Sequence, residues 1–186
     1  MPNNSLDRTE QKRGLTTVFN NLPNDVRRGS DGVDLLTSIL MRYSELGAVH
    51  YWYEQHALKF TFMIKQQIDL ASLEDILRPA LEFYHHLEGQ KIRVLEITCR
   101  NEENVSVLTI VRDLESVSQR EVGLIVELLK RKFGKQLVYD ETNLADEELA
   151  FQEEVISQML TSIKFMDIQR NVIALRDEGR VLVFNN

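Results

Sequence analysis

The chain has 186 residues, of which 43% are hydrophobic and 27% charged, a composition typical of globular proteins with a sizeable core. Its formal net charge of -7 disfavours nucleic acid and anionic membranes as partners. The single cysteine, Cys99, excludes an intramolecular disulfide framework, and no run approaches the roughly 18 apolar residues of a membrane span. We therefore expect a cytoplasmic protein that does not associate with membranes.

Composition also indicates how the chain is divided. Residues 1–13 contain no aromatic residue and one large aliphatic residue, Leu6, so we expect a disordered N-terminal arm without the apolar core of a signal peptide. Residues 14–186 are expected to form a single α+β domain. Its two halves, 30–112 and 115–186, have a similar order of predicted helices and strands, with glycines where helices end. Either an internal duplication or the common preference for glycine at the end of a helix would explain the similarity.

The first elements are expected to be a loop and a helix. Residues 23–32 are rich in Pro, Asn, Asp, Ser and Gly, which is typical of a loop, whereas residues 15–22 fit either a short helix or an edge strand. Apolar residues at helical spacing then predict a helix that begins at Asp31 or Ser30, runs to about Leu46 and is ended by Gly47.

A hairpin follows, with strands at 49–53 and 58–64. A turn centred on residues 55–56 would place Tyr51 opposite Phe60 and give the hairpin one aromatic and aliphatic core face.

The outer face of this hairpin carries three candidate binding residues: His50, Trp52 and Lys59. An exposed tryptophan costs solubility, so another layer, a partner or a ligand usually lies against it. At Trp52 we expect a protein partner or a covering helix rather than a small ligand.

Residues 72–113 are predicted to form a helix, a glycine stop and two strands. Ser72 caps the helix, whose apolar positions continue past Pro79, so one kinked helix is expected, ended by Gly89.

The two strands of this unit are expected at 92–99 and 105–111, separated by a polar turn. Apolar residues occupy both faces of the first strand, which predicts a hairpin that is central in the sheet and covered on both sides.

The remaining elements follow from a cap and from further periodic runs. Ser118 and Glu121 form a capping box that begins a helix ended by Gly134. After it we expect a short strand at 136–140, a helix at 144–164, and a hairpin with strands at 171–176 and 181–184.

The predicted order of elements is therefore αββ-αββ-αβ-αββ. Repeated hairpins imply antiparallel pairing, and amphipathic helices must cover a sheet face. We expect an α+β fold in which helices pack on an antiparallel sheet.

Two adjacent histidines, His85 and His86, are further candidates for binding. Glu82 and His85 have the Glu-x-x-His spacing of carboxylate-bridged metal sites, but the chain lacks the second copy that such a site needs. The two histidines point about 100° apart on a helix, so we interpret them as surface or interface residues and expect no metal. No phosphate-binding loop or dinucleotide fingerprint occurs, so no cofactor is expected.

Two functional hypotheses follow. The first is a non-enzymatic binding, regulatory or assembly protein that self-associates as a homodimer or binds a protein partner. The alternative is a small enzyme or metabolite-binding domain with a site near the hairpin at 50–56, using His50, Trp52, His85 or His86.

Overall fold

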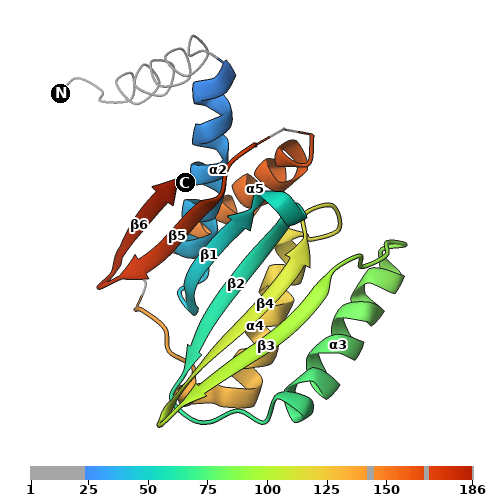
Figure 1. Ribbon diagram of the computed structural model, residues 1–186, viewed down its shortest axis with the longest axis vertical. Helices are drawn as coiled ribbons and strands as arrows, with labels where there is room; N and C mark the ends of the chain where they lie inside the picture. The colour runs from blue at the N-terminus through green and yellow to red at the C-terminus, as the bar shows by residue number, and fades with distance from the viewer. Residues whose placement is uncertain (1–23, 142–144, 166–167, 186) are drawn as a thin grey trace, which may run out of the picture.

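A computed structural model describes residues 24–141, 145–165 and 168–185. They form an α+β fold in which four helices pack on a six-stranded antiparallel sheet (Figure 1), so the predicted fold class is confirmed. The helices are α2 (Asn24–Arg42), α3 (Leu70–Leu87), α4 (Gln119–Phe133) and α5 (Asp146–Ile163). The strands are β1 (Leu46–Trp52), β2 (Ala57–Ile64), β3 (Leu95–Glu102), β4 (Val105–Asp113), β5 (Val172–Asp177) and β6 (Arg180–Asn185), in the order β3-β4-β2-β1-β5-β6. The expected N-terminal arm and the element at 15–22 lie outside the described residues.

The helices cover one face of the sheet. In Figure 1, α2, α4 and α5 lie behind the strands and α3 lies beside β3. Along β2, alternate side chains are buried beneath this layer: Leu58, Phe60, Phe62 and Ile64. The intervening side chains are half-buried or exposed: Lys59, Thr61 and Met63. We call their side of the sheet the open face, because none of the described helices covers it.

The first described helix differs from its prediction. α2 begins at Asn24, so the loop expected at 23–32 is wrong for the described part of that stretch. Gly32 lies within this helix, and a Cβ there would lie 3.4 Å from Ile168 Cδ1, an ordinary contact distance. The helix also ends earlier than expected, and Gly47, its predicted stop, lies inside β1.

The β1–β2 hairpin pairs two residues away from the predicted register. Tyr51 faces Leu58 rather than Phe60, because the connection is a 3-10 turn, Tyr53–Gln55, followed by His56 in the left-handed conformation (φ 46°). A shift of two residues keeps every side chain on its face, since the side-chain period of a strand is two. The predicted division into core and outer faces therefore holds despite the register error.

The β3–β4 hairpin is not central, which contradicts the prediction. β3 is an edge strand, and the helices cover only one of its faces. Part of the second apolar face inferred from the sequence came from Ile92 and Val94. These residues lie in the irregular segment before Leu95, where strand alternation does not apply.

α3 is longer than predicted at its start. It begins after Asp69 rather than at Ser72, because Leu70 already packs against the core, and it continues through Pro79 without a break. Gly89 follows its C-terminus with a φ of 65°, as the predicted stop requires, and Gly134 plays the same part after α4.

The C-terminal elements agree with the sequence except at one place. The strand expected at 136–140 is reduced to a single bridge between Leu137 and Ile64. α5 and the β5–β6 hairpin are present, and the two central turn residues, Glu178 (φ 46°) and Gly179 (φ 76°), both have the positive φ of a two-residue type I′ turn. None of the described helices is long and apolar enough to span a bilayer.

Candidate functional site

The structure separates the predicted site residues into two groups on opposite sides of the sheet. His50, Trp52 and Lys59 come together on the open face, with His50 directly opposite Lys59 in the β1–β2 ladder. His85 and His86 lie on α3, on the helix side, and only His85 is buried. The two groups therefore form different environments.

The open face is made of rows of side chains that cross the whole sheet. One row runs from β6 to β3 through Phe184, Ile173, His50, Lys59, Val111 and Glu96. The next row runs through Leu182, Leu175, Ala48, Thr61, Thr109 and Thr98. Both rows change from apolar residues at β6 and β5 to polar residues at β3. One half of the open face is therefore suited to contact with another apolar surface.

The most exposed members of the apolar half lie on β6. Leu182 is 36% exposed and Phe184 is 53% exposed, beside the half-buried Ile173 and Leu175 of β5. Trp52 is half-buried at the far end of β1 rather than fully exposed. We call these five residues the apolar patch. Neighbouring exposed apolar side chains of this kind commonly mark an interaction surface.

His50 adds an imidazole that suits an apolar surface. Its ring stacks on Trp52, with centroids 6.5 Å apart and an interplanar angle of 13°. Burial, assisted by the positive charge of Lys59, lowers the pKa of His50, and Glu54 opposes this only in part. Its Nε2 is buried and has no hydrogen-bond partner among the described residues. A neutral imidazole stacked on an indole contributes area to a contact without a charge that must be desolvated.

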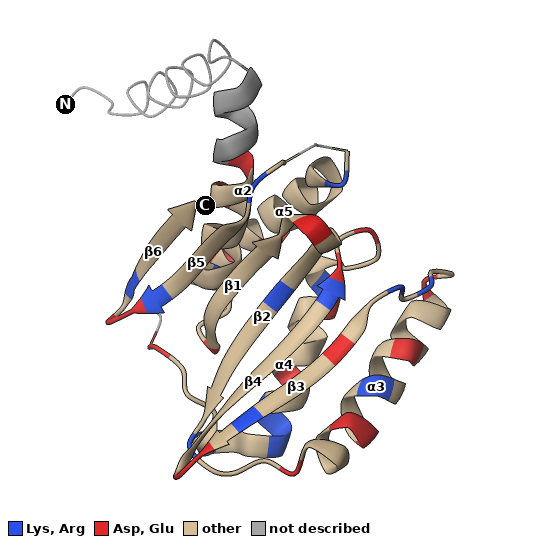
Figure 2. Ribbon diagram, in the orientation of Figure 1, with Lys and Arg blue, Asp and Glu red and all other residues tan. Residues whose placement is uncertain are grey.

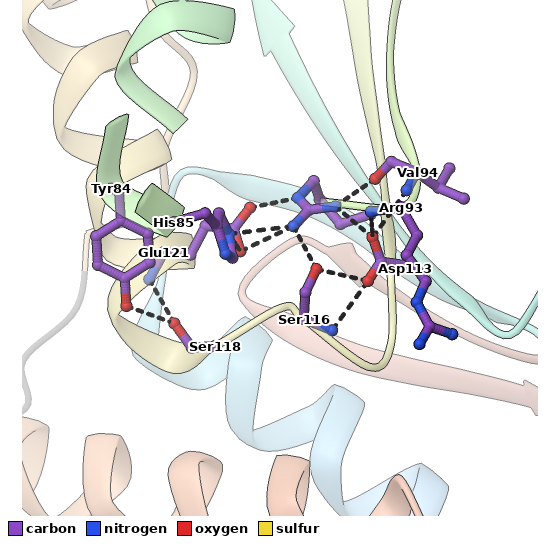
Figure 3. A network of polar contacts seen from close by, with 9 residues as sticks. Tyr84, His85, Arg93, Val94, Asp113, Ser116, Ser118 and Glu121 are labelled. Atoms are coloured by element: carbon purple, nitrogen blue, oxygen red, sulfur yellow. Dashed lines mark hydrogen bonds and ion pairs between the residues drawn. The ribbon is translucent and has the colours of Figure 1, made fainter. Parts of the chain in front are cut away.

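The second group belongs to a buried polar network between the sheet and the helices (Figure 3). At its centre is Arg112, fully buried near the end of β4. Its guanidinium donates to Glu121 through Nε and Nη2, to Val94 O and Asp113 Oδ1 through Nη1, and to Ser116 Oγ through Nη2. The Glu121 carboxylate also bonds His85 Nε2 at 2.9 Å, which joins α3 to α4.

Asp113 is the second charged centre of the network. Its carboxylate accepts hydrogen bonds from the backbone N–H groups of Arg93, Val94 and Ser116 and from the Ser116 hydroxyl, as well as from Arg112. Burial alone would raise the pKa of Asp113. The hydrogen bonds from Ser116, Val94 and Arg112 together outweigh burial and hold that pKa well below its usual range.

This network fastens four parts of the chain to one another: α3, the approach to β3, the end of β4 and the start of α4. The guanidinium of Arg112 is fully enclosed and its donors face protein acceptors, so it presents no free group to a ligand. We call this network of Arg112, Asp113, Glu121, Ser116 and His85 the clasp. Its role is structural, because it holds α3 and α4 in place against β3 and β4.

A cavity of about 510 Å³ lies beside the clasp, and His85 and His86 both line it. Two of its cations already have carboxylate partners, because Arg78 pairs with Glu74 and Arg93 pairs with Glu115. The Nδ1 atom of His85 is buried without a partner among the described residues. The two paired arginines and the single imidazole nitrogen do not form a recognisable catalytic or metal-binding group in the described part of the chain.

The two adjacent histidines are expected to differ sharply in their effect on stability. His85→Ala removes a buried hydrogen bond to Glu121 and should lower the free energy of unfolding by about 1–3 kcal/mol. His86→Ala changes an exposed side chain and should stay within about 0.5 kcal/mol. Urea denaturation of both variants beside the wild type measures the difference, and equal losses would contradict the clasp.

Among the described residues, no group of three or more His, Cys, Asp or Glu side chains is placed to hold a metal ion. The Glu-x-x-His pair does not converge on such a site, since His85 Nε2 turns to Glu121 instead of Glu82. Cys99 is half-buried and its thiol donates to Asn101 Oδ1, while burial raises the pKa of Cys99. A thiol with a raised pKa is a poor nucleophile.

Sequence reasoning did not identify the three charged residues of the clasp, which are Arg112, Asp113 and Glu121. Glu121 looked like a capping residue, and Ser118 does accept a hydrogen bond from the Glu121 N–H, but the Glu121 side chain turns inward to Arg112. One signal was available for Arg112: it follows Leu108 and Ile110 at alternate positions, so strand alternation places it on the core side.

Comparisons of this chain with protein-family models, curated proteins and solved structures find no match.

Proposed function

We propose that this protein is a non-enzymatic assembly protein that self-associates and uses the apolar half of its open face for binding. The observation that carries this proposal is the apolar patch, which no described helix covers although the four described helices pack on the opposite side of the sheet. A sheet with one uncovered face normally carries polar residues there. The β3 side of the open face follows that rule and the β6 side departs from it, which supports a contact at the β6 side.

The energetics favour a protein surface as the partner. Complete burial of a fully exposed Leu or Phe side chain contributes about 1.5–3 kcal/mol. Leu182 and Phe184 are 36% and 53% exposed, so each contributes roughly half of this or less, and several such contacts from both partners are needed for a micromolar affinity. An open sheet face made of several strands fits a second folded surface, whereas small-molecule sites are concave.

The test is the oligomeric state of the purified protein and of one double variant. Light scattering over a concentration series should show self-association of the wild type, weakened at least tenfold in Leu182→Ser/Phe184→Ser because apolar contact area is lost. Phe83→Ser is the matched control, since Phe83 is 64% exposed on α3, away from the open face. A wild type that stays monomeric throughout, or a control that dissociates it equally, would rule the proposal out.

The second candidate is a metabolite-binding domain near His50, and one observation favours it: the buried Nε2 atom of His50 has no partner among the described residues. A bound metabolite that uses this nitrogen would raise the melting temperature of the wild type but not that of His50→Ala. A metabolite screen that stabilises both proteins equally would remove this candidate.

A further inference from the structure

β6 is the outermost strand at one edge of the sheet, and β3 is outermost at the other (Figure 1). An edge strand exposes a row of unpaired backbone groups, and proteins usually protect it with charged residues, proline or a covering element. β3 has such protection, because it carries Glu96, Arg100 and Glu102 and lies beside α3. β6 carries one charged residue, Arg180, where it leaves the turn, and no proline.

Figure 2 shows this contrast between the two edges. Charged residues occur along β3, whereas those of the β5–β6 hairpin gather near its turn and leave the rest of β6 free of charge. From Val181 to Asn185 the strand reads Val-Leu-Val-Phe-Asn. An apolar edge strand without charge lacks the side chains that keep other strands from pairing with it.

The turn decides which backbone groups of β6 point away from β5. In a two-residue type I′ hairpin the pair that closes the turn is hydrogen-bonded, and this pair is Asp177 with Arg180. Hydrogen-bonded and non-hydrogen-bonded pairs then alternate along the ladder. Val181, Val183 and Asn185 therefore direct their N–H and C=O groups outward, to the side where no described strand lies.

We propose that a second copy of this chain pairs with β6 through its own β6, antiparallel, about a two-fold axis at Val183. In this register each outward-directed residue meets another one, and Leu182 lies opposite Phe184 of the second copy on the open face. Both side chains are exposed in the single chain, so the pairing buries apolar surface as well as backbone groups. The result is a continuous sheet with six strands from each copy.

The absence of charge on β6 favours a second copy of this chain as the partner. In the two-fold register Val181 lies opposite Asn185, Leu182 opposite Phe184 and Val183 opposite itself, so no charged side chain is buried or set against another charge in the paired segment. A two-fold axis also makes the contact self-complementary and closes the assembly at two chains. The apolar patches of the two copies then lie side by side and form one larger binding surface.

This inference rests on the proposed function, because it names the strand through which the self-association occurs. Only five residues pair directly, so the interface is small and we expect an affinity of about micromolar strength.

The experiment removes one outward N–H without disturbing the β5–β6 ladder. Val183→Pro deletes that donor at a position where proline is tolerated on an edge strand, and Val183→Ala is the matched control, since it also loses the half-buried side chain but keeps the N–H. Light scattering from about 1 to 200 μM, a range that brackets a micromolar Kd, should show dimers for the wild type and Val183→Ala. Val183→Pro should be monomeric, with a circular dichroism spectrum like that of Val183→Ala.

Amide hydrogen exchange on the wild type tests the same contact without any variant. The outward amides of Val181 and Val183 should exchange slowly at high protein concentration and at least tenfold faster at low concentration. The inward amides of Leu182 and Phe184 should change less.

The outcomes separate this inference from the proposed function. A dimer that survives Val183→Pro but dissociates in Trp52→Ala would overturn edge pairing and keep self-association through the open face. A dimer whose outward amides exchange equally fast at every concentration would also overturn it. A wild type that is monomeric at every concentration would overturn both.

Discussion

Replacing Arg112 with methionine is expected to lower the free energy of unfolding by about 3–5 kcal/mol, the cost of removing one partner of a buried ion pair. Arg112 and Glu121 are both fully buried. Without the guanidinium, the Glu121 carboxylate keeps only His85 and remains charged in a medium of low polarity. The Val94 carbonyl and the Ser116 hydroxyl also lose a donor.

A double variant separates the burial of an unpaired charge from the loss of packing. In Arg112→Met/Glu121→Leu the charge is gone as well, so the free energy of unfolding should recover most of the loss seen in the single variant, since replacement of a whole buried ion pair by hydrophobic residues is often neutral or stabilising. Arg100→Met on β3 is the control, since Arg100 is an exposed arginine on the neighbouring strand and should cost less than about 0.5 kcal/mol. Urea denaturation measures all three. A loss at Arg112→Met no larger than that at Arg100→Met would contradict the clasp.

Asp113→Asn is expected to cost about 1–3 kcal/mol at pH 7 and progressively less in acid. An asparagine amide places an N–H₂ group where a carboxylate oxygen now accepts hydrogen bonds. If the N–H₂ group replaces Oδ1, the backbone N–H groups of Arg93 and Val94 lose their acceptor. If it replaces Oδ2, the backbone N–H group of Ser116 loses its acceptor. Each buried donor left in this way carries a desolvation cost.

The pH dependence follows from the direction of the pKa shift. Hydrogen bonds that outweigh burial hold the folded-state pKa of Asp113 below the value of about 3.9 that an aspartate has in an unfolded chain. The carboxylate therefore stabilises the fold fully above that pH, and the contribution is lost as the pH falls below it toward the folded-state pKa. The difference in unfolding free energy between wild type and Asp113→Asn should shrink over this range.

Urea denaturation of both proteins at pH 7, 5, 4 and 3 measures this difference. Asp75→Asn, an exposed aspartate on α3, is the control and should change stability by less than about 0.5 kcal/mol at neutral pH. A gap between wild type and Asp113→Asn that stays constant down to pH 3 would show that the carboxylate has an ordinary pKa in the folded protein.

The position of the predicted site residues shows where local reasoning succeeds. His50, Trp52 and Lys59 were placed on one face by strand alternation, and they share that face although the hairpin register was two residues off. From the sequence, His85 and His86 point about 100° apart on a helix, and both are predicted to be surface or interface residues. The structure buries His85, which continues the four-residue spacing of the buried leucines of α3 (Leu73, Leu77 and Leu81), and exposes His86. Helical spacing therefore distinguishes the two histidines, whereas the partner of His85, Glu121 on α4, follows only from tertiary packing.

Local patterns were enough to establish the α+β class, the order of most elements and the turn of the last hairpin, because apolar periodicity and turn residues act over a few positions. They could not establish the strand order, the openness of one sheet face or the clasp around Arg112. These depend on contacts between segments far apart in the chain, such as β1 with β5. A strand satisfies its local preferences at the edge of a sheet or at its centre, so only tertiary packing decides which strands become neighbours.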